Sequence, residues 1–339
     1  MGFYSGVDLH SNNCVIGVID QTGQRLKKKR VHNELPAVES VLAPYREELM
    51  AVVVESTYNW YWLVDGLQER SYPVRLAHPA GNKPYSGLKH SDDVDDAFFL
   101  ADLARVNSLS EGYIYPRETR GVRDLLRQRC RLVRERTSHV LSIKNVIARE
   151  GGQALTRAQV EALSEKEIEQ VVRDSYGQVG VKALGKVLGT INQQIRQVEK
   201  TVLAHVKPDP LYQRLQTIYG VGPVLGVTIR LESGDMSRFP TVGDYTSYCR
   251  GTGSQRLSNG KPKGENNKRN GNAYLAWAFV EAALFARLHY PLAERFFERK
   301  RAQSNAILAS KALASKLTKA AFYVMRDQID FDPEKLFRS

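Results

Sequence analysis

Two kinds of hydrophobic pattern alternate over roughly the first hundred residues. Short runs rich in β-branched and aromatic residues predict strands at 3–9, 14–20, 24–31, 50–57 and 72–79. Apolar residues at helical spacing predict helices at 37–49, at 59–71, and from the aspartate-rich segment after Ser91 to about Asn107. Paired strands followed by strand–helix units predict a mixed α/β sheet domain.

The pattern becomes helical after Pro116. Apolar spacing predicts a long helix over 117–150 and further helices at 155–172 and 177–206. The first of these carries ten Arg or Lys residues against four Asp or Glu residues. We interpret this part as a long, coiled-coil-like helical hairpin with one basic face, which either contacts phosphates or is only solvated.

The last third of the chain combines helices with one long polar loop. Residues 215–239 have a helix–Gly-x-Gly–helix outline, in which backbone amides at a helix start can hold a phosphate. A short helix at 241–249 leads into a loop at 250–271 that holds five glycines, six basic residues and one acid. Loops this long without structure are usually functional or disordered. The remaining pattern predicts helices at 272–288, 290–302 and 304–327.

The charge balance narrows the class of partner. A hydrophobic fraction of 42% and a charged fraction of 25% are typical of an ordinary globular protein. The formal net charge of +12 is not. Such an excess predicts a polyanionic partner, most often nucleic acid, with an anionic membrane surface as the weaker option.

Targeting and redox signals favour a cytoplasmic location. The chain does not open on a signal-peptide pattern, and its longest apolar run, 273–286, contains Glu281 and is too short to span a bilayer. The cysteines at 14, 130 and 249 match no disulfide or zinc spacing, which favours a reducing compartment. The seven histidines form no metal-ligand pattern, so we expect each on the surface or in the core.

Four carboxylates in three segments are the strongest candidate for a metal site. Asp8 and Glu55 interrupt strand patterns, where a charge is out of place unless the strand ends at a site. Asp93 and Asp96 are three residues apart and therefore point from one face of a helix. A divalent cation would cancel the repulsion among the four carboxylates. The sequence therefore predicts an all-oxygen site suited to Mg²⁺.

Each carboxylate taken singly also has a simpler explanation. Asp8 could cap a turn, and Asp92 and Asp93 would favour a helix N-terminus, where the dipole stabilises acids by about 0.3–1 kcal/mol each. Asp92 and Asp95 offer the same three-residue spacing, shifted by one position. Coincidence is a weaker explanation for the whole ordered set of two strand acids and a helical pair.

The ordered carboxylates resemble the signature of the DEDD insertion-sequence transposases of the one-ten and eleven-eleven types, relatives of the Piv invertase. The resemblance rests on GVDLHSN around Asp8, on VVVESTYNW around Glu55 and on Asp93-x-x-Asp96-Ala97. The alanine after Asp96 favours the pair 93 and 96 over the shifted pair. The basic segment RCRLVRERTSHVLSIKNVI, the segment LQTIYGVG and the glycine-rich loop also resemble the family, so the likeness covers nearly the whole chain.

The resemblance implies a fold and a domain order. It implies an α/β RuvC-like (RNase H fold) N-terminal domain at 1–112, a basic helical hairpin or coiled coil at 113–208, and a mostly α C-terminal transposase domain at 209–339. The family carries a serine nucleophile in a Ser-Gly segment of this last domain. The matching serine here is Ser258, but Asn259 stands where the family has glycine, so Ser254 is a competing candidate.

The resemblance also implies an activity and partners. It implies an Mg²⁺-dependent DNA transposase or recombinase that forms a covalent phosphoserine intermediate, works as a dimer or tetramer, and is guided by a structured RNA that pairs with donor and target DNA. The candidate nucleic-acid contacts are the basic residues of the long helix and of the glycine-rich loop: Arg123, Arg127, Arg131, Arg134, Lys144, Arg256, Lys261, Lys263, Lys268 and Arg269.

Two other functions remain open from the sequence. A RuvC-like structure-specific nuclease would need the four carboxylates but would use water instead of serine. A catalytically silent nucleic-acid-binding scaffold would need neither. Replacement of the serine separates the first alternative from the transposase, and replacement of Asp8 or Glu55 separates the second.

Overall fold

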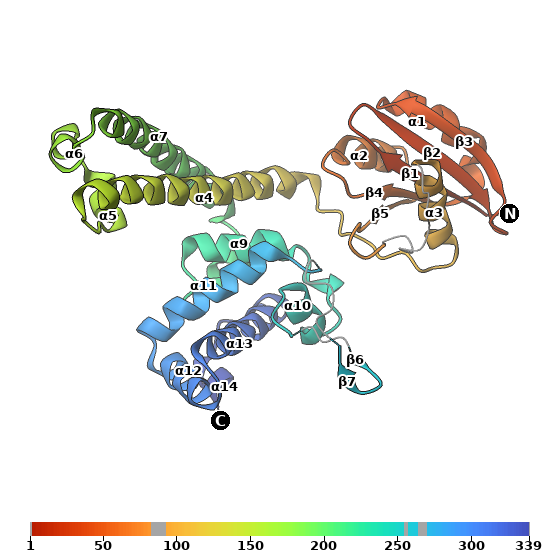
Figure 1. Cartoon of the computed structure of the whole chain (residues 1–339). Coiled ribbons are helices and arrows are strands. Elements are labelled where there is room, and N and C mark those ends of the chain that lie inside the picture. The colour runs from red at the N-terminus through yellow and green to blue at the C-terminus, as the bar shows by residue number, and fades with distance from the viewer. Residues whose placement is uncertain (1, 83–92, 254–256, 264–269, 339) are drawn as a thin grey trace. The chain divides into compact units, whose positions relative to one another are not determined.

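The computed structural model describes residues 2–82, 93–253, 257–263 and 270–338. The chain divides into two compact units, Met1–Arg117 and Glu118–Ser339, which are described separately (Figure 1). The predicted order of a mixed α/β sheet followed by a mostly helical chain is confirmed. The finer division at 1–112, 113–208 and 209–339 stays a prediction. In the described residues, no helix is both long enough and apolar enough to cross a membrane.

The five predicted strands form one sheet in the first unit. They are β1 (Phe3–Leu9), β2 (Asn13–Asp20), β3 (Arg25–His32), β4 (Leu49–Glu55) and β5 (Val74–Ala77). Their order across the sheet is β3-β2-β1-β4-β5. The first three strands along the chain pair antiparallel, whereas β4 pairs parallel with both β1 and β5. The carboxyl ends of β1, β4 and β5 therefore lie at the same edge of the sheet.

Helices cover the two faces of this sheet unequally. On one face, α1 (Leu35–Leu42) and α2 (Tyr61–Glu69) build the main core of the unit with alternate residues of the strands, including Val7, Val52 and Val54. The 3-10 turn η1 (Ala43–Glu48) leads from α1 into β4. The other face carries only α3 (Asp93–Arg105) among the described helices of the unit. Because strand side chains alternate, every second residue of β1 and β4 faces α3.

Two glycines allow α3 to lie directly on the strands. Gly6 of β1 pairs with Gly17 of β2. A Cβ at Gly6 would lie 2.0 Å from the carbonyl oxygen of Ala97, and one at Gly17 would lie 2.8 Å from the ring of Phe98. The absence of side chains at Gly6 and Gly17 thus lets the start of α3 pack directly on the strands, with Phe98 covering Gly17.

The second unit begins with a long helical hairpin. It is made of α4 (Arg117–Gly151) and α7 (Ser175–Val206), which run side by side, with α5 (Arg157–Ala162) and α6 (Glu165–Val171) between them at the tip (Figure 1). The single helix predicted over 155–172 is wrong. Ser164 starts a new helix there, because its side chain and that of Glu167 form a capping box.

The rest of the second unit is a helical bundle around one core. It contains α8 (Pro210–Leu215), α9 (Pro223–Ser233), η2 (Met236–Arg238), α10 (Val242–Tyr248), α11 (Ala273–His289), α12 (Pro291–Gln303), α13 (Ala306–Asp327) and α14 (Pro333–Phe337). Tyr245, Phe279 and Phe322 are among its fully buried side chains. The loop predicted to be unstructured contains the short strands β6 (Leu257–Ser258) and β7 (Lys261–Pro262).

Replacement of Gly6 by alanine should destabilise the first unit. The added methyl group would collide with the backbone of α3, and overpacking of this kind costs about 1–3 kcal/mol. Thermal unfolding measures the effect. Gly121→Ala is the control, because nothing lies within 4 Å of a Cβ at this α4 position. Alanine in a helix interior should raise the stability there by about 0.5–1 kcal/mol. Equal melting temperatures for Gly6→Ala and the parent chain would contradict this close contact between β1 and α3.

Candidate functional site

Asp8 and Glu55 lie side by side on the α3 face of the sheet. Val7 pairs with Val54 in the parallel β1–β4 ladder, so the next residue of each strand brings the two carboxylates together at the strand ends. Asp8 is buried and Glu55 is partly buried. Burial, then the charges of Asp8 and Asp96, raise the pKa of Glu55. The two strand acids therefore form one electrostatic site.

The start of α3 brings a third carboxylate to this site. Asp96 lies in the first turn of α3, next to the Ala97 that rests on Gly6, and its charge acts on Glu55. Asp93 is the first residue of α3, but its side chain lies outside the described part of the chain. Two of the other predicted carboxylates, Asp8 and Asp96, thus lie within electrostatic reach of Glu55.

The other aspartate of this turn has a different partner. The Asp95 carboxylate lies 3.0 Å from Nη2 of Arg25, at the start of β3, and both side chains are about half exposed. The guanidinium of Arg25 also stacks over the Phe98 ring, 4.3 Å from its centroid. Asp95 and Phe98 thus tie the first turns of α3 to the edge of the sheet. Asp92 lies outside the described residues.

His10 also belongs to this site, although the sequence reasoning assigned every histidine to the surface or the core. Its Nε2 lies 3.2 Å from Oδ2 of Asp8. The side-chain amides of Asn33 and Asn59 donate hydrogen bonds to its backbone carbonyl, at 3.0 and 2.8 Å, and so hold the loop after β1. The spacing Asp8-x-His10 at a strand end was the available signal, but it is too short and common to be read alone.

The donor set suits a hard cation. Asp8, Glu55 and Asp96 offer only oxygen, the ligand atom that Mg²⁺ prefers. Asp8 and Asp96 act on Glu55 through space, although within the described side chains no three His, Cys, Asp or Glu residues are close enough to be grouped as a metal site. A positive charge between them would relieve the repulsion that raises the pKa of Glu55.

The backbone of Ser258 lies in a two-residue β-hairpin. Ser258 in β6 pairs with Lys261 in β7. Asn259 and Gly260 form the turn with φ angles of 52° and 72°. Positive φ at both positions is typical of a type I′ turn, for which Asn-Gly is the preferred sequence. This dipeptide was a hairpin signal that the sequence reasoning missed. Asn259 adopts this conformation without a glycine because Asn tolerates positive φ.

Several predicted site residues of this loop lie outside the part of the chain that the structure describes. They are the side chain of Ser258 and the whole of Ser254, Arg256, Lys268 and Arg269. Lys261 and Lys263 are described and exposed. Both are therefore accessible to a nucleic-acid backbone.

The two ends of this loop, residues 250–271, are fastened together. The backbone N–H of Asn272 donates a 2.6 Å hydrogen bond to the carbonyl of Tyr248. The guanidinium of Arg250 donates hydrogen bonds to the carbonyls of Asn270 and Gly271, at 2.9 and 3.2 Å. The loop that carries Ser258 is thus closed at its base.

A buried carboxylate lies beneath that base. Glu232 of α9 is fully buried and accepts two hydrogen bonds from Arg127, at 2.6 and 2.9 Å, and one from Arg123, at 3.1 Å. Asn272 donates a fourth, at 2.8 Å, and its own side-chain oxygen caps the start of α11. Burial alone would raise the pKa of Glu232, but the hydrogen bond from Arg127 and the charges of both arginines lower it. Glu232 therefore joins α4, α9 and the end of the serine loop.

This network gives two predicted nucleic-acid contacts an internal role. Arg123 is buried, and both its guanidinium and that of Arg127 pair with Glu232. Composition counts them as free positive charge because their acidic partner lies about a hundred residues away in the sequence. Arg131 and Arg134 are exposed on α4, and Lys144 is partly exposed. These three remain available for contacts outside the protein.

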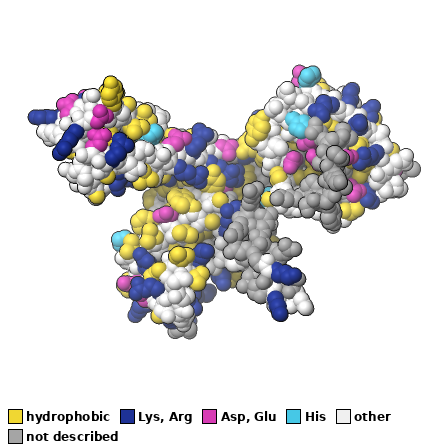
Figure 2. All heavy atoms as spheres, viewed as in Figure 1, with side chains coloured by type: hydrophobic (Ala, Val, Ile, Leu, Met, Phe, Trp, Pro, Cys, Tyr) yellow, Lys and Arg dark blue, Asp and Glu magenta, His cyan; other side chains and the backbone are white. Residues whose placement is uncertain are grey.

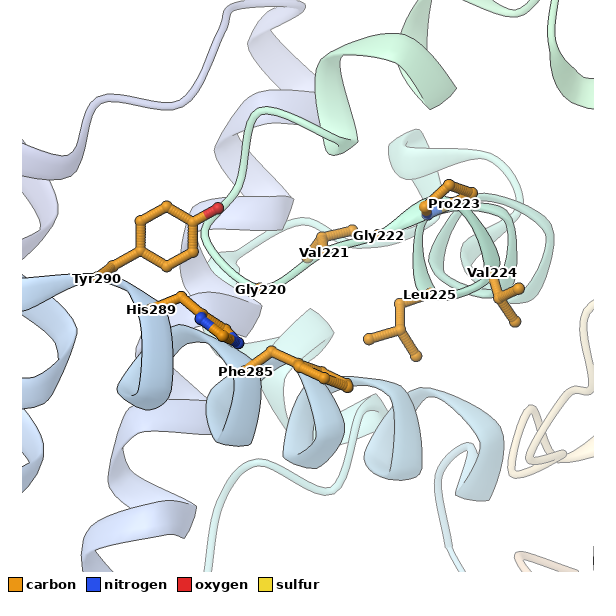
Figure 3. Close-up of a pocket in the computed structure, with 9 residues that line it drawn as sticks. All are labelled: Gly220, Val221, Gly222, Pro223, Val224, Leu225, Phe285, His289 and Tyr290. Carbon is orange, nitrogen blue, oxygen red and sulfur yellow. The ribbon is translucent and has the colours of Figure 1, made fainter. Parts of the chain in front are cut away.

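The predicted helix–Gly-x-Gly–helix segment lines a mostly apolar pocket. Gly220 to Leu225 form one wall, and Phe285, His289 and Tyr290 at the end of α11 form the other (Figure 3). The pocket has a volume of about 410 Å³. Gly222 caps α9 without a side-chain hydrogen bond. The lining is more apolar than a phosphate site requires, so the pocket itself does not support the predicted phosphate contact.

Comparisons with known proteins agree on one family. A family model described as transposase, of the DEDD type of IS110, matches residues 5–149. A second, described as transposase of the IS116/IS110/IS902 family, matches residues 212–298. The first contains the carboxylate strands and α3, and the second contains Glu232 and the serine loop.

Two curated relatives are named transposases, and a third is a protein of insertion element IS110. A probable family 20 transposase of Pseudomonas aeruginosa is 27% identical over 66% of this chain and 67% of its own length. The transposase for insertion sequence element IS1328 of Yersinia enterocolitica is 23% identical over 94% of this chain and 95% of its own. An uncharacterized 43.6 kDa protein of insertion element IS110 in Streptomyces coelicolor is 26% identical over 43% of this chain and 36% of its own.

Glu232→Gln should destabilise the second unit strongly. The variant removes the negative charge that Glu232 supplies to the buried guanidinium of Arg123 and the partly buried one of Arg127, and breaking a buried pair costs about 3–5 kcal/mol. Denaturant unfolding measures the loss. Asp330→Asn is the control, since Asp330 pairs with Arg214 on the exposed surface of the same unit and should cost no more than about 1 kcal/mol. Similar losses in the two variants would refute the central role of Glu232.

The stability of the parent chain and the stability of Glu232→Gln should depend differently on pH. Because the folded-state pKa of Glu232 is lowered, its contribution is complete above its ordinary value of 4.5 and is lost as the pH falls through the folded-state value. The stability gap between the parent chain and Glu232→Gln should therefore be constant near neutral pH and narrow below about pH 4.5. Unfolding curves across this range check it, and a gap that widens in acid would contradict the assignment.

Proposed function

The chain belongs to the IS110-type DEDD transposases, and from this premise we propose that it cleaves and rejoins DNA strands at a site formed by Asp8, Glu55, Asp93 and Asp96. The single observation that carries the proposal is that the strand ends bring Asp8 and Glu55 together on one face of the sheet, where the charges of Asp8 and Asp96 both act on Glu55. An acid whose pKa is raised by burial and by neighbouring acids is typical of a catalytic site.

The strand order of the first unit supports a RuvC-like assignment. Three antiparallel strands are continued by two parallel ones, and the acids lie at the ends of β1 and β4. Bound Mg²⁺ would activate an attacking oxygen and stabilise the leaving one. Asp8, Glu55 and Asp96 would hold the cation together with Asp93. His10 would keep the Asp8 carboxylate in place, because it contacts Oδ2.

We assign the nucleophile to Ser258. Its Oγ attacks the scissile phosphorus, the new Oγ–P bond forms and the P–O3′ bond breaks. The hydroxyl proton leaves the serine as the attack occurs, and the 3′-oxygen takes up a proton. The phosphoserine keeps the energy of the phosphodiester, so attack by another 3′-hydroxyl can rejoin the strand. The two-residue hairpin supports this assignment because it holds the Ser258 backbone next to a tight turn.

The partners follow from charge and family. We propose that donor and target DNA, a structured guide RNA and further copies of the chain, as a dimer or tetramer, assemble around this site. Arg131, Arg134 and Lys144 on α4 and Lys261 and Lys263 beside the serine are the described basic residues that support contact with phosphates. Arg123 and Arg127 are excluded from this set, since Glu232 binds both guanidinium groups. Arg256, Lys268 and Arg269 stay in it as predictions.

Neutralising the carboxylates should abolish strand cleavage while leaving the fold intact. Asp96→Asn and Glu55→Gln remove charge from the site, so each should lower the cleavage rate by at least about 100-fold, as expected when a catalytic group is lost. Cleavage of a labelled DNA carrying the element ends, with its RNA and Mg²⁺, measures this. Asp95→Asn is a matched control on the same helix turn, because the Asp95 carboxylate forms a surface ion pair with Arg25, and such pairs contribute little. Full activity of Asp96→Asn would overturn the proposed site.

The serine assignment is tested by the covalent intermediate. The parent chain should form a protein–DNA adduct that survives denaturation, and Ser258→Ala should form none because no hydroxyl remains to attack. Ser254→Ala should keep the adduct. Denaturing electrophoresis of end-labelled DNA separates these species. Cleaved strands without an adduct from the parent chain would favour the water-using nuclease, and an adduct lost only in Ser254→Ala would move the nucleophile to that residue.

A further inference from the structure

The edge strand β3 carries an unusual density of positive charge. Five of its eight residues are basic, and all five are exposed: Arg25, Lys27, Lys28, Lys29 and Arg30. The strand forms the outer edge of the sheet that holds the carboxylates. Arg and Lys side chains gather over this part of the unit in the space-filling view (Figure 2).

The ladder register divides these charges between the two faces of the sheet. Asp8 pairs with Val15, and Val15 pairs with Arg30. One row along, Gly6 pairs with Gly17, and Gly17 pairs with Lys28. Because directly paired residues point to the same side, Arg30 and Lys28 face the side on which α3 and the carboxylates lie.

The carboxylate-face pair lies close to the site. Neighbouring strands are about 4.8 Å apart, so the backbone of Arg30 lies roughly 10 Å from that of Asp8 across β2. Nη1 of Arg30 donates a 2.9 Å hydrogen bond to Oδ1 of Asn13, another residue of this face. This bond keeps the Arg30 guanidinium on the carboxylate side. Arg25 lies on the same face but is held by Asp95 and Phe98 of α3.

The other two lysines provide an internal comparison. Lys27 pairs with Val18 and Lys29 pairs with Ile16. Both partners belong to the core that faces α1 and α2, so Lys27 and Lys29 point to the side away from the carboxylates. The strand therefore offers two equal pairs of positive charges on opposite faces.

We propose that Lys28 and Arg30 form a binding site for the phosphodiester backbone of the DNA strand that enters the carboxylate site. This inference rests on the proposed function. A substrate phosphate that approaches three carboxylates meets repulsion, and two cations on the same face of the sheet offset it. DNA is the chosen occupant because it is the polyanion on which the proposed reaction acts.

A simpler explanation exists for a charged edge strand. Lysines at a sheet edge prevent edge-to-edge aggregation, and for that purpose both faces serve equally. The two explanations differ in one respect. Only a binding site predicts that replacing Lys28 and Arg30 lowers DNA affinity more than replacing Lys27 and Lys29.

The test compares DNA binding by Lys28→Gln/Arg30→Gln with binding by Lys27→Gln/Lys29→Gln. Fluorescence anisotropy of the full chain with a labelled DNA oligonucleotide, across a salt series, gives the affinity and its salt slope. Loss of two phosphate contacts should reduce the slope by about 1.4–1.8 and the low-salt affinity roughly tenfold in the first variant. The second variant should change the slope by less than half as much. Melting curves verify folding, and the charge-retaining Lys28→Arg/Arg30→Lys should restore binding.

Each remaining outcome counts against the site. Equal losses in the two double variants would mean a diffuse charge effect, and no loss in either would mean that β3 does not contact DNA. An RNA oligonucleotide of the same sequence forms the second arm, and a loss confined to RNA would overturn the assignment to DNA. The assay needs no cleavage. If the parent chain failed to cleave, the proposed function would fall while the comparison of the two faces still decided this site.

Discussion

Repulsion of the Glu55 carboxylate by Asp8 and Asp96 is the constraint that the structure of the first unit has to meet. Carboxylates that repel one another would move apart if their backbones were free. Parallel pairing of β1 with β4 fixes two of them at neighbouring strand ends. The absence of side chains at Gly6 and Gly17 lets α3 lie close enough to supply the third carboxylate. The stability of the sheet thus opposes a local electrostatic cost, which is typical of a site kept for function rather than for folding.

Two buried glutamates show opposite responses to their surroundings. Glu55 faces other acids, and burial together with their charges raises its pKa. Glu232 is more deeply buried, yet its pKa is lowered because two arginines and one asparagine bind it. Glu232 needs no further partner and serves to join helices under the serine loop. The charges of Asp8 and Asp96 act on Glu55 in the opposite direction, so a bound cation would relieve repulsion at its site.

The positive charge of the chain is distributed between internal and external uses. Arg123 and Arg127 contribute to the net charge of +12 but are bound to Glu232, so the basic face of α4 is narrower than its sequence suggests. Strand β3 has the opposite character. Its five Lys and Arg side chains are exposed, on a strand that belongs to the same sheet as the carboxylates. Charge counts by segment therefore overestimate α4 relative to β3 as a polyanion-binding surface.

The sequence by itself determined the local structure and the order of the site. Period-two and helical patterns predicted all five strands and most helices, because those patterns reflect which face of an element is buried. Asp8 and Glu55 stand out in the sequence because a charge in a strand pattern is costly to bury, and Asp93 and Asp96 stand out because their spacing places them on one face of a helix; their role stays a prediction. Two short signals were missed, the capping box at Ser164 and the Asn259-Gly260 turn. Each can be recognised only when the ends of the flanking helices or strands are known.

Only the tertiary structure decided which residues share a partner. That His10 contacts Asp8, that Asp95 binds Arg25 instead of joining the acidic site, and that Glu232 takes two arginines from the basic helix all depend on contacts between distant segments. The face on which Lys28 and Arg30 lie depends on strand register, and a shift of one residue would reverse it. Pattern and composition describe what each segment can bury, whereas pairing between segments decides which charges are compensated and which remain for a ligand.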